Sequence, residues 1–169
     1  KEFIAAMKML QRDHIQRHKM LGSWAGAMGQ TQFMPSSYLR YAADGNGDGE
    51  KNIWTEHYDV FASIANYLHT EGWNPNLPWG VEVTVNQPID MALSGTEEGK
   101  QRSLSDWQKL GVTSKFLTSE RQQKLTALSQ TDLWLVRPER ELGRAFLVSN
   151  NYRTLLHWNK SNYFAVSIG

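Results

Sequence analysis

The sequence predicts an α+β fold that is mainly helical, with a small β-containing subdomain inserted between helical parts. Apolar residues recur at helical spacing over residues 2–11 and again over 60–68, which is typical of amphipathic helices. Over residues 81–85, valines instead alternate with polar residues, as they do in a half-buried strand. The chain has 169 residues, of which 40% are hydrophobic, so it has the length of one ordinary domain and enough apolar side chains for a core.

The first part of the chain, residues 1–80, is predicted to be helical. Ser23 is placed to cap a short helix that runs through Met28, and Gly29 breaks it. A proline then opens a helix over 36–43. The next helix ends at Gly72, and its apolar stripe consists of Val60, Phe61, Ile64, Ala65 and Leu68.

The middle part, residues 81–148, is predicted to hold the strands. The strand over 81–85 is followed by a polar, glycine-rich segment and by a helix that begins at Ser103 or Ser105 and ends at Leu110. Two more strands are predicted over 125–136 and 145–148, separated by a charged turn. The last part, residues 149–169, returns to short helices over 150–158 and 162–168.

Composition excludes several classes of function. The net charge is +1, which gives no electrostatic argument for binding nucleic acid or an anionic membrane. The chain has no cysteine, so it has no disulfide, no thiolate metal site and no cysteine nucleophile. No apolar run in these residues is long enough to span a bilayer, and we expect no signal peptide among them.

The stretch from Gly22 to Tyr38 is the most informative part of the sequence. Its three glycines and two alanines allow close backbone approach, while tryptophan, methionine and phenylalanine can wall the space that results. It carries hydroxyls and amides but no charge, which suits a neutral, hydroxyl-rich ligand such as a sugar. The alternative is a tight corner between two helices, with small residues at the crossing.

The stretch that begins at Asp44 has the spacing of the front half of a calcium loop. Oxygen-bearing side chains occupy positions 1, 3 and 5 as Asp44, Asn46 and Asp48, and a glycine at position 6 permits the sharp turn. Glu50 at position 7 would offer its backbone carbonyl, and Asn52 at position 9 would reach the ion directly or through water. Position 12 is a threonine and not the usual bidentate glutamate. The alternative is a turn with solvated carboxylates.

These segments together resemble bacterial lytic murein transglycosylases of the B type, which have a lysozyme-like fold. The resemblance rests on Gly-Ser-Trp-Ala-Gly-Ala-Met-Gly-x-x-Gln-Phe-Met-Pro-Ser-Ser-Tyr at 22–38, on the loop at 44–48, on Ala-Asn-Tyr at 65–67 with Gly-Trp at 72–73, and on Asn-x-Ser at 159–161. It is strong over 8–73, weak in the middle and moderate from residue 150. Trp158 departs from the family, which more often has tyrosine there.

The resemblance implies a substrate groove for peptidoglycan glycan strands. By position, Ser23 matches a hydroxyl that orients substrate, Gln32 an amide that contacts an acetamido sugar, and Tyr67 a wall of the groove. Asn159, with Ser161 and Tyr163, matches the far side near the reacting sugar. Without the resemblance the residues have ordinary explanations. Ser23 would be a helix cap and Gln32 a surface amide, while Tyr67 would belong to the core and Asn159 to a turn.

The resemblance also implies the metal and the cellular setting. It adds Asp59 to the metal ligands Asp44, Asn46, Asp48, Glu50 and Asn52, with Ca²⁺ in a structural role and no other cofactor. The resemblance implies that the parent protein is a lyase of the periplasm or cell envelope of a Gram-negative bacterium, where it can be anchored to the membrane. It also implies a monomer that binds no nucleic acid.

The sequence offers no candidate for the catalytic acid. Transglycosylases of this type use a single glutamate as acid and then as base, and such a residue needs an apolar pocket that raises its pKa. Glu2 is expected to be solvated, Glu50 and Glu56 belong to the metal loop and its exit, and Glu71 lies at a helix end. We therefore expect the catalytic glutamate upstream of residue 1 and this fragment to be inactive alone. The alternative function is a non-catalytic module that binds peptidoglycan, another glycan or calcium.

Overall fold

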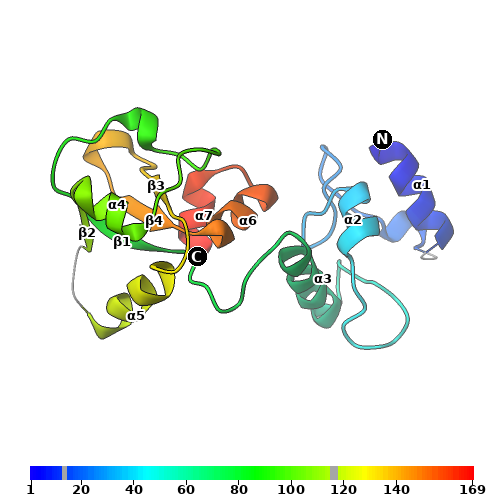
Figure 1. Cartoon of the computed structure of the whole chain (residues 1–169). Helices are drawn as coiled ribbons and strands as arrows, with labels where there is room; N and C mark the ends of the chain where they lie inside the picture. The colour runs from blue at the N-terminus through cyan, green and yellow to red at the C-terminus, as the bar shows by residue number, and fades with distance from the viewer. Residues whose placement is uncertain (13–14, 115–117) are drawn as a thin grey trace. The chain divides into compact units, whose positions relative to one another are not determined.

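The computed structural model describes residues 1–12, 15–114 and 118–169 (Figure 1). It consists of two compact units, residues 1–71 and residues 72–169. Over the described residues it contains seven α-helices and one four-stranded antiparallel sheet, which confirms the predicted α+β class. None of the helices in this described part combines the length and the apolar character that crossing a membrane requires.

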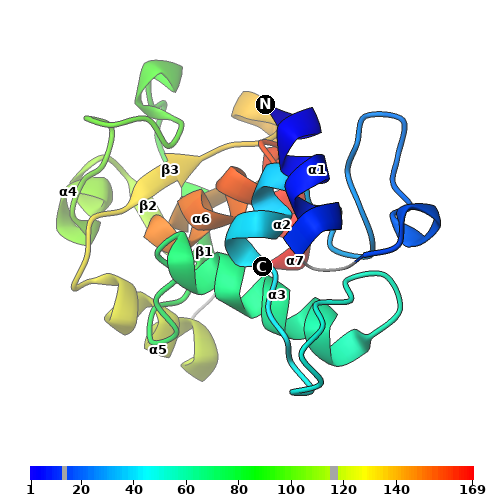
Figure 2. The same ribbon diagram turned by 90° about the vertical axis from the view of Figure 1, so that its right-hand side faces the viewer.

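The first unit is built from helices and the loops between them. Figure 2 shows α1 beside α2, with α3 running past them. The helix predicted over 2–11 is confirmed as α1, and the helix predicted over 36–43 is confirmed with an earlier end. The elements are α1 (Glu2–Arg12), the 3₁₀ turn η1 (Arg17–Lys19), α2 (Pro35–Tyr41) and α3 (His57–Thr70).

The short helix predicted from Ser23 to Met28 is wrong. This segment is a looped hairpin in which Met28 pairs with Gly22 on one side and with Phe33 on the other. The N–H of Ser23 donates to the carbonyl of Ala27 at 2.8 Å. Gly26 has a φ of 91°, and a residue in that conformation cannot continue a right-handed helix. Ser23 therefore closes a turn and does not cap a helix.

The buried face of α3 also differs from the predicted stripe. Val60 is buried as expected, but Phe61 is 68% exposed. The residues that face inward include the polar Asp59 and Ser63, because their side chains bind backbone groups of the preceding loop. Gly72, with a φ of 93°, follows the end of the helix as predicted.

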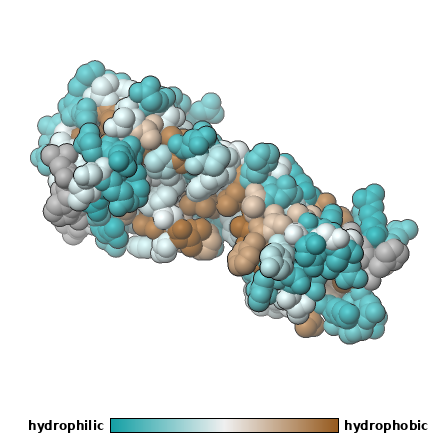
Figure 3. Space-filling view, turned by 90° about the horizontal axis from the view of Figure 1, so that it is seen from below, coloured by the Kyte–Doolittle hydropathy of each residue, from teal (hydrophilic) through white to brown (hydrophobic). Residues whose placement is uncertain are grey.

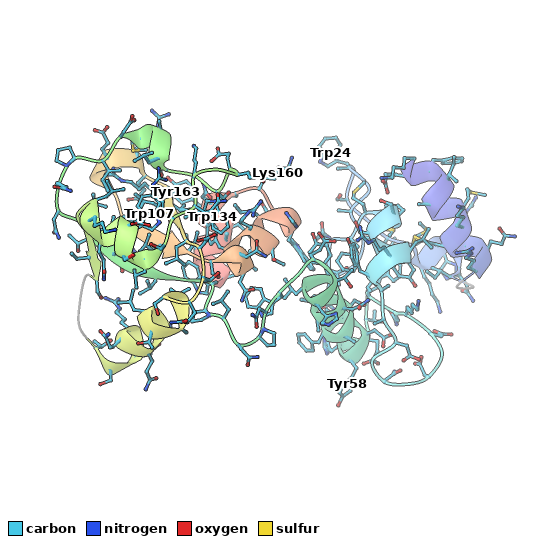
Figure 4. The ribbon with its side chains drawn as sticks, in the orientation of Figure 1. Trp24, Tyr58, Trp107, Trp134, Lys160 and Tyr163 are labelled. Carbon is cyan, nitrogen blue, oxygen red and sulfur yellow. The ribbon has the colours of Figure 1, made fainter. Side chains whose placement is uncertain are left out.

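Several apolar side chains of the first unit reach its surface. Figure 3 shows apolar residues exposed among polar ones. Figure 4 shows Trp24 projecting from the tip of its loop and Tyr58 pointing away from α3. The large exposed apolar residues of this unit are Phe3, Ile4, Met7, Leu21, Trp24, Tyr58 and Phe61.

The second unit is a sheet in the strand order β2-β1-β4-β3, with all neighbours antiparallel. The strands predicted over 81–85 and 145–148 and both C-terminal helices are confirmed. The elements are β1 (Gly80–Val85), the 3₁₀ turn η2 (Met91–Leu93), α4 (Leu104–Lys109), β2 (Val112–Ser114), α5 (Ser119–Leu128), β3 (Trp134–Val136), the 3₁₀ turn η3 (Arg140–Leu142), β4 (Ala145–Val148), α6 (Asn150–Trp158) and α7 (Asn162–Ile168).

The long strand predicted over 125–136 is wrong in its first half. Residues up to Leu128 belong to α5, which Thr118 caps by accepting the N–H of Arg121, and the strand begins only at Trp134. Leu125 and Leu128 are three residues apart, so both can face the same side of a helix. The short strand β2 was not predicted.

The sheet is covered on both faces. On one face Leu147 of β4 lies opposite Val81 and Leu135 in the register and packs in one cluster with Trp107 and Leu128. On the other face Phe146 packs against Trp79, whose ring lies 5.9 Å from that of Tyr152 on α6. Since successive residues of a strand point to opposite faces, all four residues of β4 are buried.

A buried amide fixes the connection that enters this unit. The side chain of Asn151, at the start of α6, is fully buried. Its Nδ2 donates to the carbonyls of Asn74 at 2.8 Å and Leu77 at 2.6 Å, and its Oδ1 accepts the N–H of Asn74 at 2.8 Å. The hydrogen bonds of this one side chain therefore supply partners to three backbone groups of a segment that is neither helix nor strand.

Candidate functional site

The glycine-rich corner at residues 22–38 is anchored to the segment that follows the acidic loop. The N–H of Gln30 donates to the carbonyl of Ile53 at 2.8 Å, and its side-chain Nε2 donates to the carbonyl of Trp54 at 3.0 Å. The hydroxyl of Tyr38 donates to the carbonyl of Lys51 at 2.9 Å. The corner and the loop exit therefore form one bonded assembly within the first unit.

Gly29 makes this close approach possible. A Cβ atom at this position would lie 2.5 Å from the carbonyl oxygen of Ile53, and the residue has a φ of 59°. Both the space and the backbone conformation demand glycine. The prediction that small residues allow segments to approach closely is thus met at this residue.

Ser23 lines a cavity of about 410 Å³ on the corner. Its hydroxyl accepts the N–H of Ala27 at 3.2 Å, which holds the side chain on the turn. Three methionines and several small residues surround the space. The lining residues are Glu2, Phe3, Ala6, Met20, Gly22, Ser23, Ala25, Gly26, Met28, Met34 and Pro35.

Glu2 is the one charged residue in this lining; it is partly exposed, and it also makes a specific contact that was not predicted. Its Oε2 accepts the N–H of Ser36 at 2.9 Å and its Oε1 accepts the hydroxyl of the same residue at 2.8 Å. The backbone hydrogen bond and then the hydroxyl hydrogen bond lower the pKa of Glu2. No local sequence signal predicts a contact between residues 34 positions apart.

Gln32 has an unusual backbone conformation. Its φ is 52°, in the left-handed region that residues other than glycine rarely adopt. The side-chain Nε2 donates to the carbonyl of Gly29 at 2.9 Å and so folds back onto the corner. Such conformations often occur at ligand-binding positions.

Tyr67 lies behind the corner in a cluster of aromatic rings. Its ring centroid is 4.6 Å from that of Tyr41 and 5.9 Å from that of Phe33, and the residue is only 8% exposed. Burial raises the pKa of Tyr67, and burial together with a hydrogen bond to Glu71 raises the pKa of Tyr41 to about 12. Both phenols are therefore neutral at pH 7.

The acidic loop folds around its first carboxylate. Asp44 Oδ1 accepts the N–H of Gly47 at 2.6 Å and Oδ2 accepts the N–H of Gly49 at 2.8 Å, bonds that lower its pKa. The Nδ2 of Asn46 donates to Oδ2 of Asp48 at 2.9 Å. The side-chain oxygens of these three residues accept backbone N–H groups of the loop, and they are of the types that supply oxygen ligands to a hard cation such as Ca²⁺.

The remaining predicted ligands contribute differently. Asp59 is fully buried, and its oxygens accept the N–H groups of Gly45 at 2.8 Å and Asn52 at 2.6 Å, so it ties the two ends of the loop together. The Oδ1 of Asn52 accepts the N–H groups of Trp54 and Thr55, and Glu50 is exposed. Within residues 1–12, 15–114 and 118–169 no group of three or more His, Cys, Asp or Glu side chains is placed to hold a metal.

The other predicted site residues belong to the second unit, at the junction of α6 and α7. Asn159 ends α6, and its Oδ1 accepts the N–H of Ser161 at 3.0 Å. Ser161 caps α7 by accepting the N–H of Phe164 at 3.3 Å. Tyr163 is 60% exposed beside a small cavity of about 130 Å³, and Figure 4 labels it together with Lys160. Asn159 and Ser161 are therefore bonded to each other, whereas Tyr163 lines a cavity with residues of the η3 region and β4.

Comparison with known proteins bears on the whole chain. Residues 1–169 match the family model described as the transglycosylase SLT domain. The curated relative is membrane-bound lytic murein transglycosylase B of Escherichia coli K12, which is 56% identical over 52 residues, 31% of this chain and 14% of the relative.

Solved structures resemble the chain over nearly its full length. SltB3 of Pseudomonas aeruginosa in complex with NAG-anhNAM-pentapeptide has 39% identity and a TM-score of 0.85, over 99% of this chain and 43% of that one. Slt35 of Escherichia coli in complex with calcium has 27% identity and a TM-score of 0.75, over 99% of this chain and 49% of that one. The chain therefore spans less than half the length of these relatives.

Proposed function

Since the chain belongs to the transglycosylase SLT domain family, we propose that it forms part of a peptidoglycan lytic transglycosylase. The reaction cleaves the β-1,4 bond between N-acetylmuramic acid and N-acetylglucosamine without water. A glutamic acid protonates the bridging oxygen as the bond to the anomeric carbon breaks. The sugar's own 6-hydroxyl then bonds to that carbon and gives its proton to the same glutamate, which leaves a 1,6-anhydro product.

The observation that carries the proposal is the cavity beside Ser23. Its lining combines small residues with methionines and Phe3, the hydroxyl of Ser23 is held on a fixed turn, and both oxygens of its one carboxylate bind Ser36. A mostly uncharged surface whose single charge is negative suits an uncharged sugar ring better than an anionic ligand. SltB3, which shares 39% identity with this chain, holds a NAG-anhNAM-pentapeptide, and this supports a murein ligand here.

The proposed roles follow the positions of the residues. Ser23 orients the substrate, and Gln32 contacts the acetamido group of a sugar. Tyr67 stabilises the wall of the groove through its ring contacts with Phe33 and Tyr41. Asn159, Ser161 and Tyr163 act near the reacting sugar. In the proposed division, residues 1–80 are the helical cleft-forming part, residues 81–148 the inserted β-containing subdomain and residues 149–169 the C-terminal helical part.

The proton donor is proposed to lie outside these 169 residues. A general acid that works near neutral pH needs a raised pKa. Among the described carboxyl groups that show a resolved change, the pKa is lowered in every case, by hydrogen bonds to backbone N–H groups, hydroxyls or lysines. These groups are Glu2, Asp44, Glu97, Asp106 and Glu120.

Calcium is proposed as a structural ion of the acidic loop. Asp44, Asn46 and Asp48 would hold it with side-chain oxygens, and Glu50 and Asn52 would add oxygens from the other half of the loop. Asp59 would act from the base, where it binds the backbone at both loop ends. The ion would stiffen the loop whose exit bonds to the glycine-rich corner. The calcium complex of Slt35 supports this proposal.

The cellular setting is proposed to be the periplasm or envelope of a Gram-negative bacterium. The curated relative is named as membrane-bound. The proposed substrate, the glycan strands of peptidoglycan, is found in the same place, and a monomer is sufficient for the proposed groove.

The test is digestion of purified murein by the full-length protein in H₂¹⁸O. A transglycosylase gives anhydromuropeptides that contain no ¹⁸O, and mass spectrometry detects them. Reducing-end products that carry ¹⁸O would show a hydrolase instead. No product of either kind, together with binding of murein, would favour the second candidate function, a non-catalytic module for peptidoglycan, other glycans or calcium.

Matched variants test the site. Gln32→Ala and Ser23→Ala should each lower the rate of anhydromuropeptide release, by roughly ten- to a hundredfold if one transition-state contact is lost. Gln123→Ala, an exposed glutamine on α5, is the control and should leave the rate unchanged. Equal rates for Gln32→Ala, Ser23→Ala and the control would contradict the proposed roles.

A further inference from the structure

A second cavity, of about 440 Å³, lies on the first unit between the turn η1 and the exit of the acidic loop. The indole Nε1 of Trp54 donates to the carbonyl of Leu21 at 2.7 Å and joins the two segments that form it. The ring of Trp54 is in turn 6.0 Å from that of the buried Tyr38. The lining residues are Ile15, Gln16, His18, Lys19, Leu21, Glu50, Lys51, Asn52, Trp54 and Thr55.

A single segment of chain separates this cavity from the one beside Ser23. Lys19 and Leu21 line the second cavity, whereas Met20 and Gly22 line the first. Alternate residues of this segment, which turns at Met20, therefore face two different spaces. A ligand that fills the first cavity needs to extend past only one segment to reach the second.

The two cavities differ in charge. The first has one charged group in its lining, the carboxylate of Glu2, whose two oxygens already bind Ser36. The second is lined by Lys19, Lys51 and His18 together with the indole of Trp54, against the one carboxylate of Glu50. A pocket with an aromatic wall and a few polar groups suits a small ligand that has both apolar and anionic parts.

We propose that the second cavity binds the acidic peptide stem of the saccharide whose sugar lies in the first. This inference rests on the proposed function. Murein joins an uncharged glycan to a short peptide with free carboxylates, so one substrate carries both chemistries that the two cavities offer. Lys19 and Lys51 bind the carboxylates, and Trp54 and Leu21 contact the aliphatic parts of the peptide.

Glu50 at the same rim opposes this binding. It is exposed and carries the one carboxylate in the lining. Its repulsion of a carboxylate ligand weakens binding, so Glu50→Gln strengthens it. Because Lys19 and Glu50 are exposed and Lys51 is only partly buried, salt screens the attraction.

The test is a ¹⁵N NMR titration of the 169-residue chain with the tripeptide L-alanyl-γ-D-glutamyl-diaminopimelate. The expected result is that amide shifts concentrate at residues 15–21 and 50–55. The double variant Lys19→Gln, Lys51→Gln weakens binding by roughly three- to tenfold, since two exposed charge contacts are lost. Glu50→Gln tightens it by roughly two- to fivefold. The control Lys8→Gln, Lys124→Gln, which removes one exposed and one partly buried lysine elsewhere, leaves affinity unchanged.

Two results overturn the proposal. One is that the same peptide with its carboxylates amidated shifts these amides with equal affinity. The other is that the acidic peptide shifts no amides there. A parallel titration with chitotetraose distinguishes this failure from failure of the proposed function, because shifts around Ser23 depend on the first cavity alone. Absence of both responses contradicts both.

Discussion

Both carboxylate oxygens of Glu2 bind a single residue, Ser36, through its backbone N–H at 2.9 Å and its hydroxyl at 2.8 Å. Ser36 lies in the first turn of α2, where N–H groups lack partners within the helix. The side chain of α1 thus caps α2 across 34 residues and joins the two helices. Its negative charge also lies at the positive end of the helix dipole.

We expect Glu2→Gln to lower the stability of this helix pair by about 1 kcal/mol at neutral pH. The folded pKa of Glu2 lies below its ordinary value of 4.5, so the stabilisation is complete above that pH and is lost as the pH falls through the folded pKa. Native-state hydrogen exchange of α2 amides measures the effect. The exposed Glu98→Gln is the control, and a difference from it that persists below the folded pKa would contradict the explanation.

Asp59→Asn should destabilise the first unit by about 2–3 kcal/mol, even with calcium removed by EDTA. In the native protein the backbone N–H groups of Gly45 and Asn52 each donate to one carboxylate oxygen of Asp59. The asparagine variant has only one acceptor oxygen for these two donors. Thermal unfolding measures this, with the exposed Asp132→Asn as control. An effect seen only with calcium present would instead make Asp59 chiefly a metal ligand.

Alanine variants of two glycines with positive φ distinguish the cost of a steric clash from the cost of backbone strain. Gly29→Ala places a Cβ 2.5 Å from the Ile53 carbonyl, whereas Gly47→Ala meets no atom within 4 Å. We expect Gly47→Ala to cost about 1 kcal/mol for conformation alone, and Gly29→Ala to cost about 2–4 kcal/mol because overpacking is added. Equal melting temperatures for the two variants would show that the corner relaxes around the added methyl group.

Asn151→Ala should destabilise the second unit by about 2–3 kcal/mol, because it leaves partly buried backbone groups of Asn74 and Leu77 without these partners and empties a buried position. Asn76→Ala removes an exposed amide from the same connection and should change stability by less than about 0.5 kcal/mol. Chemical denaturation followed by far-UV circular dichroism compares them. Similar midpoints would mean that water reaches the 74–77 segment.

Thr31→Val should stabilise the first unit by about 1 kcal/mol. Thr31 is buried, and among the described residues its hydroxyl has no hydrogen-bond partner. A methyl group of similar size removes the desolvation penalty. Differential scanning calorimetry measures the change, and a lower melting temperature would show that the hydroxyl binds a water or ligand in solution.

The sequence predicted those elements whose pattern depends on local spacing. Helix α6 and strand β1 have strong periodicity and clear caps or turn residues at their ends, so their bounds were predicted closely. The helix expected at Ser23–Met28 failed because composition does not reveal that Gly26 adopts a positive φ. The predicted apolar stripe of α3 was wrong because the hydrogen bonds that Asp59 and Ser63 make with the preceding loop turn their side of the helix inward. Phe61 is left exposed although it is apolar.

The residues of the candidate site also fall into two groups, those that a local sequence motif predicted and those that it did not. Ser23 and Asp44 were found because a motif of fixed spacing marks them, and each takes part in a turn that the motif explains. The capping role of Glu2 and the second cavity around Trp54 were not predicted. Both depend on contacts between segments more than 30 residues apart, and one sequence alone holds no signal for such pairing.

The position of Trp24 has a practical consequence for spectroscopy. Its indole is fully exposed on the turn beside Ser23, whereas Trp107 is completely buried in the second unit. Acrylamide therefore quenches the emission of Trp24 before that of Trp107, and the five other tryptophans add to the total signal. The chain thus carries its own fluorophore beside the proposed groove, and occupancy by a saccharide can be followed without attaching a dye.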